Sequence, residues 1–184
     1  MITSSLSIME LLKNKLFEFP ALVDGLKNKD YNFLELLEAW MKETESILVN
    51  HKFSEGAIIA GYRSKIIAPL FADTQKRSAR KRQIQVASEV LFEIQNTVFL
   101  VINPIEIKID EARNLLIHLL SITKQSEAIK YNESIDFQSF ISQIWKLFST
   151  HEQLKPSSIK ILTLVSQIDA LRIMAEEINL SEWK

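Results

Sequence analysis

The sequence feature that most constrains the fold is a long stretch of helical hydrophobic periodicity over residues 75–102. Its apolar residues recur at steps of three and four: Ile84, Ala87, Leu91, Ile94 and Val98. Other apolar residues lie off this stripe, so neighbouring helices must cover more than one face. The pattern predicts the central helix of an all-α bundle, ending at Asn103 and Pro104.

The scarcity of turn residues also favours long helices over a many-stranded sheet. The chain of 184 residues contains three glycines and four prolines, which leaves few positions for tight turns. Its hydrophobic content of 47% is enough for a full-sized core. We predict a single-domain bundle over residues 1–184, with six or seven mostly antiparallel helices around the central one. An alternative division has sub-structures at 1–103 and 104–184.

Capping residues and prolines indicate where the other helices begin and end. Ser7 with Glu10 forms a capping box that starts the first helix, and Pro20 is expected to end it. Helical periodicity then recurs in four further stretches, at residues 30–51, 56–68, 136–151 and 161–178.

Residues 105–109 fit two secondary structures. Asn103 as an N-cap followed by Pro104 at the first helical position predicts a new helix. However, three isoleucines alternate strictly with charged residues in this segment, which is typical of a strand. We favour the helix, because helical periodicity continues to Leu119.

A cluster of five cations lies at the start of the central helix: Lys76, Arg77, Arg80, Lys81 and Arg82. Arg80 falls in line with the apolar stripe, four residues before Ile84, although an unpaired cation is costly to bury. Either this end extends past the packed body, or the helix begins near Ala79, or acidic groups meet the cations. An exposed basic face fits an acidic partner or a phosphate, while a merely solvated helix end is the plain interpretation.

A polar stripe at helical spacing includes the most interesting of the three histidines. Its members are Glu111, Asn114, His118, Ser121 and Gln125. The ordinary interpretation is the wet face of an amphipathic helix. The functional alternative is the wall of a groove, in which His118 acts as a general base or a pH-sensitive donor. His51 and His151 fall at predicted helix ends, where a cation is favoured by the helix dipole.

Most catalytic and cofactor signatures are missing from the sequence. The absence of cysteine excludes disulfides, thiolate nucleophiles and cysteine-ligated metals. No phosphate loop, dinucleotide fingerprint, zinc-protease motif or nucleophile elbow occurs. We therefore expect no catalytic residues, no cofactor and no metal.

These observations favour a non-enzymatic helical adaptor or regulatory protein that binds a protein partner or itself. One alternative is a nucleic-acid- or phosphate-binding regulator that uses the basic cluster 76–82. It is less favoured, because no aromatic residues are interleaved with the cations. Another alternative is a small-ligand binder or enzyme with a groove near His118. The longest apolar runs are about five residues and no secretory signal is evident, so we expect a soluble cytoplasmic protein without membrane insertion.

Overall fold

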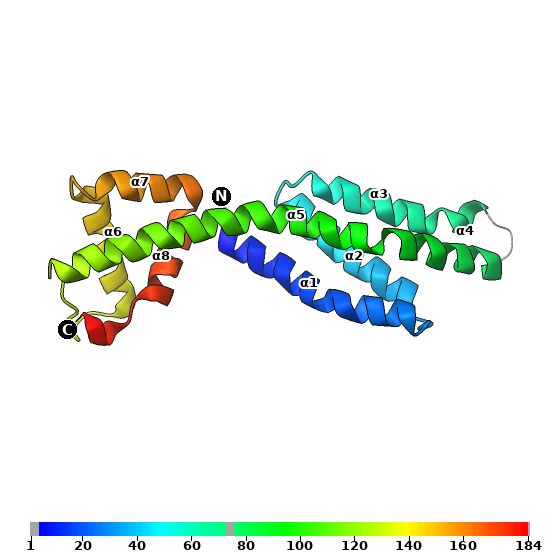
Figure 1. Ribbon diagram of the computed structural model, residues 1–184, viewed down its shortest axis with the longest axis horizontal. Helices are drawn as coiled ribbons and strands as arrows, with labels where there is room; N and C mark the ends of the chain where they lie inside the picture. The colour runs from blue at the N-terminus through cyan, green and yellow to red at the C-terminus, as the bar shows by residue number, and fades with distance from the viewer. Residues whose placement is uncertain (1–3, 73–75, 184) are drawn as a thin grey trace. The chain divides into compact units, whose positions relative to one another are not determined.

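The computed structural model describes residues 4–72 and 76–183, and all regular secondary structure within these ranges is helical (Figure 1). Seven helices have ten residues or more, and α4 and the 3-10 helix η1 are shorter. The prediction of an all-α helical bundle is confirmed. The chain forms two compact units: an N-terminal unit, Ser7–Pro104, and a C-terminal unit, which joins residues 4–6 to residues 105–183. A single cooperative domain stays a prediction.

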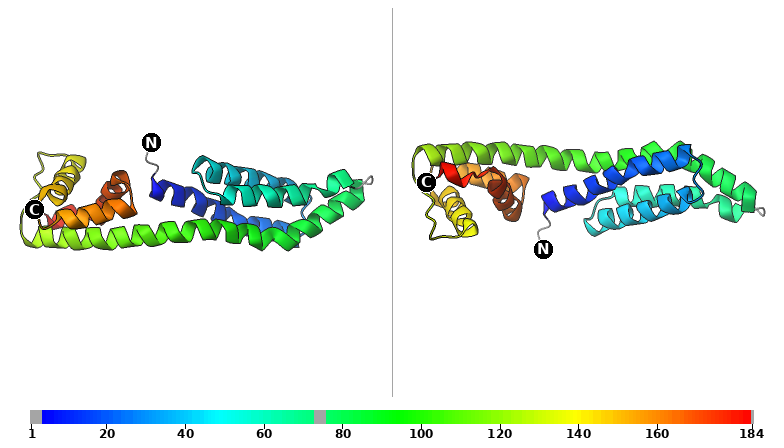
Figure 2. Two further views of the ribbon diagram at one scale, coloured as in Figure 1. Left: turned by 90° about the horizontal axis from the view of Figure 1, so that it is seen from above. Right: turned by 90° about the horizontal axis from the view of Figure 1, so that it is seen from below.

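The N-terminal unit contains α1 (Ser5–Lys27) from Ser7 onward, α2 (Phe33–Asn50), α3 (Glu55–Ile67), α4 (Pro69–Ala72) and the first part of α5 (Lys76–Gln125). Helices α2 and α3 lie side by side as a hairpin (Figure 2). The ring of Trp40 packs edge-on against Phe19 with centroids 5.4 Å apart, and its indole N–H donates to the Lys15 carbonyl at 2.8 Å. The predicted stripe of α5 is part of this core: Ala87, Leu91, Ile94 and Val98 are buried.

Two helices continue through a proline that was expected to end them. Helix α1 passes through Pro20, and α5 passes through Pro104, so the central helix is not confined to residues 75–102. Both prolines are exposed, which lets water reach the carbonyl groups that lose a helical hydrogen bond. The neighbouring Phe19 and Ile102 are buried. Their packing offsets the cost of about 3 kcal/mol for a proline inside a helix.

Residues 105–109 are helical, as the capping pattern favoured, although no new helix begins there. Ile109 is buried while Ile107 is 67% exposed, so the alternation of isoleucine with charged residues does not mark the two faces of a strand. The buried residues follow helical spacing instead: Ile109, Ala112, Leu116 and Leu119.

The C-terminal unit contains the later part of α5, α6 (Phe137–Thr150), α7 (Lys155–Leu164), α8 (Gln167–Glu177) and η1 (Leu180–Glu182). Helix α6 begins as predicted, with the Asp136 carboxylate accepting from the Ser139 N–H at 2.9 Å. Phe140 forms edge-on ring contacts with Tyr131 and Trp183, at centroid distances of 5.1 Å and 5.6 Å. These rings form the aromatic core of the unit.

The prediction of one continuous helix over residues 161–178 is wrong, because the chain breaks between α7 and α8. Ser166 adopts an extended conformation, and its hydroxyl accepts from the Asp169 N–H at 3.1 Å. This is an N-cap, and a serine followed three residues later by an acidic residue is its sequence signature. The apolar spacing of three and four continued across the break and concealed it.

The buried carboxylate of Asp169 also receives donors from the start of α1. The Ser5 N–H donates to it at 2.9 Å, the Leu6 N–H at 3.4 Å, and the Ser4 hydroxyl completes the group. The Ser166 hydroxyl donates to the same carboxylate at 2.8 Å. One acidic side chain therefore satisfies the first amides of α1, which begins two residues before the predicted Ser7 cap.

Helix α5 is the one helix in the described ranges that is long and apolar enough to cross a membrane. Its most apolar 18-residue window has a mean hydropathy of 1.3, and 39% of that window is buried. The core helix of a water-soluble protein meets the same criterion. The cytoplasmic location stays a prediction.

Candidate functional site

The basic cluster lies on the first two turns of α5, because that helix begins at Lys76 rather than near Ala79. The loop alternative for these cations is therefore wrong. The side chain of Lys76 falls outside the described part of the structure. Arg77, Lys81 and Arg82 are exposed, and Arg80 is half-buried.

Arg80 is held by a backbone carbonyl and an aromatic ring. Its guanidinium lies over the ring of Tyr31 at 4.4 Å from the centroid, and its Nη2 donates to the Tyr31 carbonyl oxygen. Both contacts stabilise a cation without an acidic side chain. They explain how Arg80 lies in line with the apolar stripe without being an unpaired buried charge.

Arg77 and Lys81 differ from Arg80 in their surroundings. They lie one helical turn apart and therefore project from the same side of α5. Neither belongs to an ion pair within residues 4–72 and 76–183. The structure thus separates one internally bound cation from two that face solvent.

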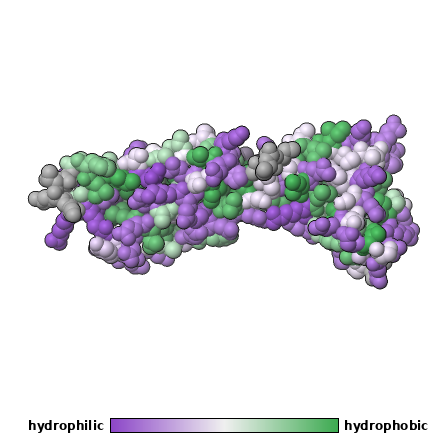
Figure 3. All heavy atoms as spheres, turned by 180° about the vertical axis from the view of Figure 1, so that it is seen from behind, coloured by the Kyte–Doolittle hydropathy of each residue, from purple (hydrophilic) through white to green (hydrophobic). Residues whose placement is uncertain are grey.

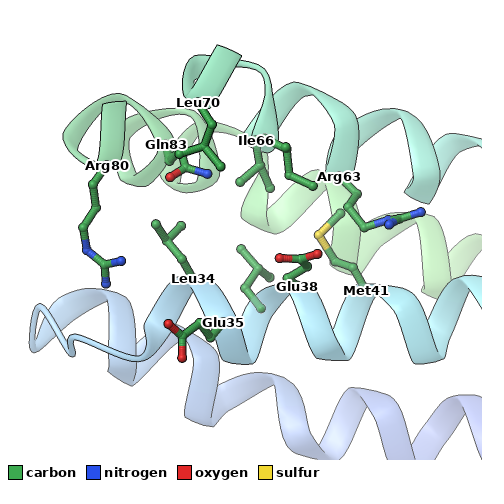
Figure 4. Close-up of a pocket in the computed structure, with 11 residues that line it drawn as sticks. Leu34, Glu35, Glu38, Met41, Arg63, Ile66, Leu70, Arg80 and Gln83 are labelled. Carbon is green, nitrogen blue, oxygen red and sulfur yellow. The ribbon is translucent and has the colours of Figure 1, made fainter. Parts of the chain in front are cut away.

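A pocket of about 240 Å³ lies beside Arg80, between α2, α3, α4 and α5 (Figure 4). Leu34 and Met41 rise from α2 toward Ile66 of α3. Leu37 and Ile67 complete an apolar floor, and Leu70 of α4 lies at the edge. Four charged side chains and one amide also line this pocket: Glu35, Glu38, Arg63, Arg80 and Gln83.

Two of the charged residues of the pocket belong to ion pairs within the N-terminal unit. Arg63 pairs with Glu45 at 2.9 Å, and Glu38 pairs with Lys42 at 2.7 Å. Figure 4 shows Glu35 pointing away from Leu34, Ile66 and Met41. The pocket therefore offers an incoming group an apolar floor, the Arg80 guanidinium and the Arg63 Nε–H, which has no hydrogen-bond partner among the described residues.

Large apolar side chains are exposed next to the cations. Phe71 is 87% exposed and Leu70 51%, and both belong to α4. Figure 3 shows hydrophobic side chains gathered at the end of the N-terminal unit where α4 lies. We call the following residues the basic end: Tyr31, Leu70, Phe71, Arg77, Arg80 and Lys81. Arg80 joins them, because it contacts Tyr31, shares the pocket with Leu70 and lies on the same turns as the other cations.

All members of the polar stripe are exposed on α5 in the C-terminal unit: Glu111, Asn114, His118, Ser121 and Gln125. Glu111 pairs with Lys160 of α7 at 2.7 Å. Ser121 lines a small pocket of about 180 Å³ that also involves Lys124 and Trp183. This arrangement has the form of a solvated helix face, and a catalytic groove around His118 stays a hypothesis.

No candidate metal site is present in the part of the chain that the structure describes. Within it, no group of three or more His, Asp or Glu side chains could hold an ion.

The contact between Arg80 and Tyr31 could not be predicted from the sequence, because the two residues are 49 positions apart. The N-cap at Ser166, in contrast, could have been recognised in the sequence, because the acidic residue Asp169 follows three positions later.

The fold and the basic end define an all-α protein with an amphiphilic surface beside a small pocket that has an apolar floor. Comparison with known proteins adds no relative: no protein-family model, no curated protein and no solved structure matches the chain.

Proposed function

We propose that the protein is a non-enzymatic adaptor or regulatory protein whose basic end binds an acidic segment of a protein partner. The observation that carries this proposal is that the cations of the basic end have two different surroundings. Arg80 is bound internally, while Arg77 and Lys81 remain exposed beside the exposed side chains of Leu70 and Phe71. Apolar surface rimmed by charge is typical of interaction sites. Aromatic residues and arginine are enriched in such interfaces.

The expected binding is charge-assisted rather than driven by charge alone. Exposed cations at the rim of an interface speed association and select an acidic partner, and salt screens their effect. The apolar neighbours Leu70 and Phe71 supply the burial that makes a complex last. Affinity should therefore fall with salt without disappearing.

A nucleic acid is the second candidate, because the structure brings aromatic rings close to the cations. Base stacking on exposed rings is common in proteins that bind single strands. However, Arg80 already covers one face of the Tyr31 ring, which leaves only its other face and the Phe71 ring of the basic end for stacking. The apolar floor of the adjacent pocket also suits a protein side chain better than a base edge.

The first test is selection of 12-residue random peptides on the full chain, followed by fluorescence anisotropy with the enriched peptides. We expect enrichment of Asp and Glu, and a loss of affinity of about tenfold in the double variant Arg77→Glu, Lys81→Glu. The matched control is Lys108→Glu with Lys146→Glu, two exposed cations of the C-terminal unit, which should bind like the wild type. Peptides without acidic residues, or equal affinity in both double variants, would contradict the proposal.

Self-association is a special case, in which the acidic segment belongs to a second copy of the chain. Sedimentation equilibrium measures the oligomeric state of the wild type and of the Arg77→Glu, Lys81→Glu variant, and so distinguishes self-association from binding of another protein. A wild-type dimer that dissociates in the variant would identify the partner as the chain itself.

A further inference from the structure

We infer that the pocket beside Arg80 receives one aromatic side chain of the acidic segment, so that the partner carries an aromatic anchor close to its carboxylates. This inference rests on the proposed function and adds what the partner must contain. Three properties of the pocket support it: its volume, the side chains that form its floor and walls, and its position next to the exposed cations.

The volume suits a single side chain. Pockets for small molecules and cofactors usually measure about 300–1,000 Å³. The pocket beside Arg80 holds about 240 Å³, which falls below that range. An aromatic side chain is a large group in a compact form, and such residues dominate the anchors of protein interfaces.

The walls favour an apolar occupant. Leu37 and Met41 of the floor are each 1% exposed, and Ile66 is 6% exposed, so their packing is set by the fold. Methionine adapts its shape to an incoming ring at low cost. Arg63 and Glu38 are paired with Glu45 and Lys42, respectively, whereas Arg80 adds to the same walls a guanidinium without an acidic partner among the described residues. An aromatic ring can fill this floor and also stack on the guanidinium groups of Arg80 and Arg63, which line the pocket.

The position of the pocket links the anchor to the acidic residues. Arg80 lines the pocket, while Arg77 lies three residues before it and Lys81 directly follows it. A ring seated in the pocket therefore places the adjoining turns of a helical segment near both exposed cations. We expect carboxylates three or four residues from the aromatic anchor, the spacing that puts them on one helical face.

The decisive variant fills the pocket from its edge. Leu70→Trp changes a side chain that is 51% exposed, so the core is not disturbed. Its control is Leu100→Trp on α5, where the original side chain is 60% exposed and lies about five helical turns after Lys81. Circular dichroism during thermal unfolding shows whether both variants keep the wild-type fold.

The experiment measures anisotropy of an enriched acidic peptide and of the same peptide with its aromatic residue changed to alanine. Against wild type, the alanine peptide should bind about tenfold or more weakly. Against Leu70→Trp, the original peptide should lose a similar factor, and the two peptides should then bind alike. Leu100→Trp should behave like the wild type.

The outcomes separate this inference from the proposed function. If Arg77→Glu with Lys81→Glu weakens the peptide but Leu70→Trp and the alanine peptide have no effect, the anchor inference is overturned and the acidic partner stands. If the charge variant has no effect, the proposed function falls with it. Salt-sensitive binding of labelled oligonucleotides or of vesicles with anionic lipid, unchanged in Leu70→Trp, would overturn the inference as well.

Discussion

In the C-terminal unit, the buried carboxylate of Asp169 accepts hydrogen bonds from two segments of the chain, whereas at the basic end of the N-terminal unit Arg77 and Lys81 face solvent. The later part of α5 is also tied to its neighbours by ion pairs. Arg113 reaches Glu176 at 2.8 Å, and Lys124 reaches Glu182 at 2.5 Å.

Two parts of one helix therefore differ in the surroundings of their charged side chains. Where α5 belongs to the C-terminal unit, Glu111, Arg113 and Lys124 form ion pairs within that unit. Where it belongs to the N-terminal unit, Arg80 contacts Tyr31, while Arg77 and Lys81 are exposed. We therefore expect substitutions of polar residues to affect stability most in the C-terminal unit and binding most at the basic end.

The largest expected loss of stability comes from Phe140→Ala. Phe140 is fully buried between Tyr131 and Trp183, so its removal should lower the free energy of unfolding by about 4 kcal/mol. Urea unfolding followed by circular dichroism measures this loss. Phe92→Ala, at a 65% exposed position of the N-terminal unit, should change it by about 0.5 kcal/mol or less.

Hydrogen exchange with peptide resolution then sharpens the comparison. Exchange that rises only within residues 105–183 of Phe140→Ala would show that the C-terminal unit unfolds by itself. An equal rise in both units would instead support a single cooperative domain.

The second largest effect is expected for Asp169→Ala. The change leaves the first amides of α1 and the Ser166 hydroxyl without their acceptor, and we expect a loss of about 3 kcal/mol. The same urea titration measures it, with Asp110→Ala as the control at an exposed aspartate of α5. Equal stability of the two variants would show that the Asp169 contacts contribute nothing.

A smaller loss of stability should distinguish Arg80 from Lys81 at the basic end. Arg80→Ala removes the contacts with the Tyr31 ring and carbonyl, and should cost about 1 kcal/mol of stability. Lys81→Ala should leave the unfolding free energy unchanged but weaken binding of an acidic peptide. If the two variants destabilise the protein equally, the division between internal and exposed cations is wrong.

The smallest effects concern pH, and they differ in direction between the units. In the C-terminal unit, hydrogen bonds from the Ser139 side chain and backbone lower the pKa of Asp136, and Lys130 lowers the pKa of Glu127. A lowered folded pKa contributes stability above the unfolded value, 3.8 for aspartate, which is lost as pH falls through the folded value. Melting temperatures below pH 4 should therefore fall less steeply in Asp136→Asn than in the wild type.

The N-terminal unit should respond at alkaline pH instead. Burial and a hydrogen bond to Glu93 raise the pKa of Tyr62 above its usual 10.0. A raised folded pKa contributes stability that is present below pH 10 and lost as pH rises through the folded value. Tyr62→Phe should flatten this alkaline loss, and an unchanged alkaline slope would contradict the assignment.

The sequence predicted helices well where apolar periodicity and capping agreed. Helix α6 begins after Asp136 as expected, and α2 ends next to His51. The errors occurred where burial overrides a local signal, as at Pro20 and Pro104, or where a capping signal interrupts an unbroken apolar pattern, as at Ser166. Periodicity reports which face is buried, and it does not report whether the backbone is continuous.

Only part of the candidate site could be predicted from the sequence. The cations are adjacent along the chain, so their cluster and the unusual register of Arg80 could be predicted. Tyr31 comes from the turn before α2, Leu34 from α2 and Leu70 from α4, and only the tertiary fold brings them beside Arg80. The pocket is formed by packing between four helices, and no single stretch of sequence encodes it.

The most direct test of the central claim is a salt series of anisotropy titrations with three probes: an enriched acidic peptide, a single-stranded oligonucleotide and vesicles with anionic lipid. Wild type is compared with Arg77→Glu, Lys81→Glu and with Lys108→Glu, Lys146→Glu. We predict that the acidic peptide binds most tightly, that salt weakens it, and that only the first variant loses about tenfold in affinity. Tighter binding of the oligonucleotide or the vesicles, or peptide binding that the first variant retains, would contradict the account.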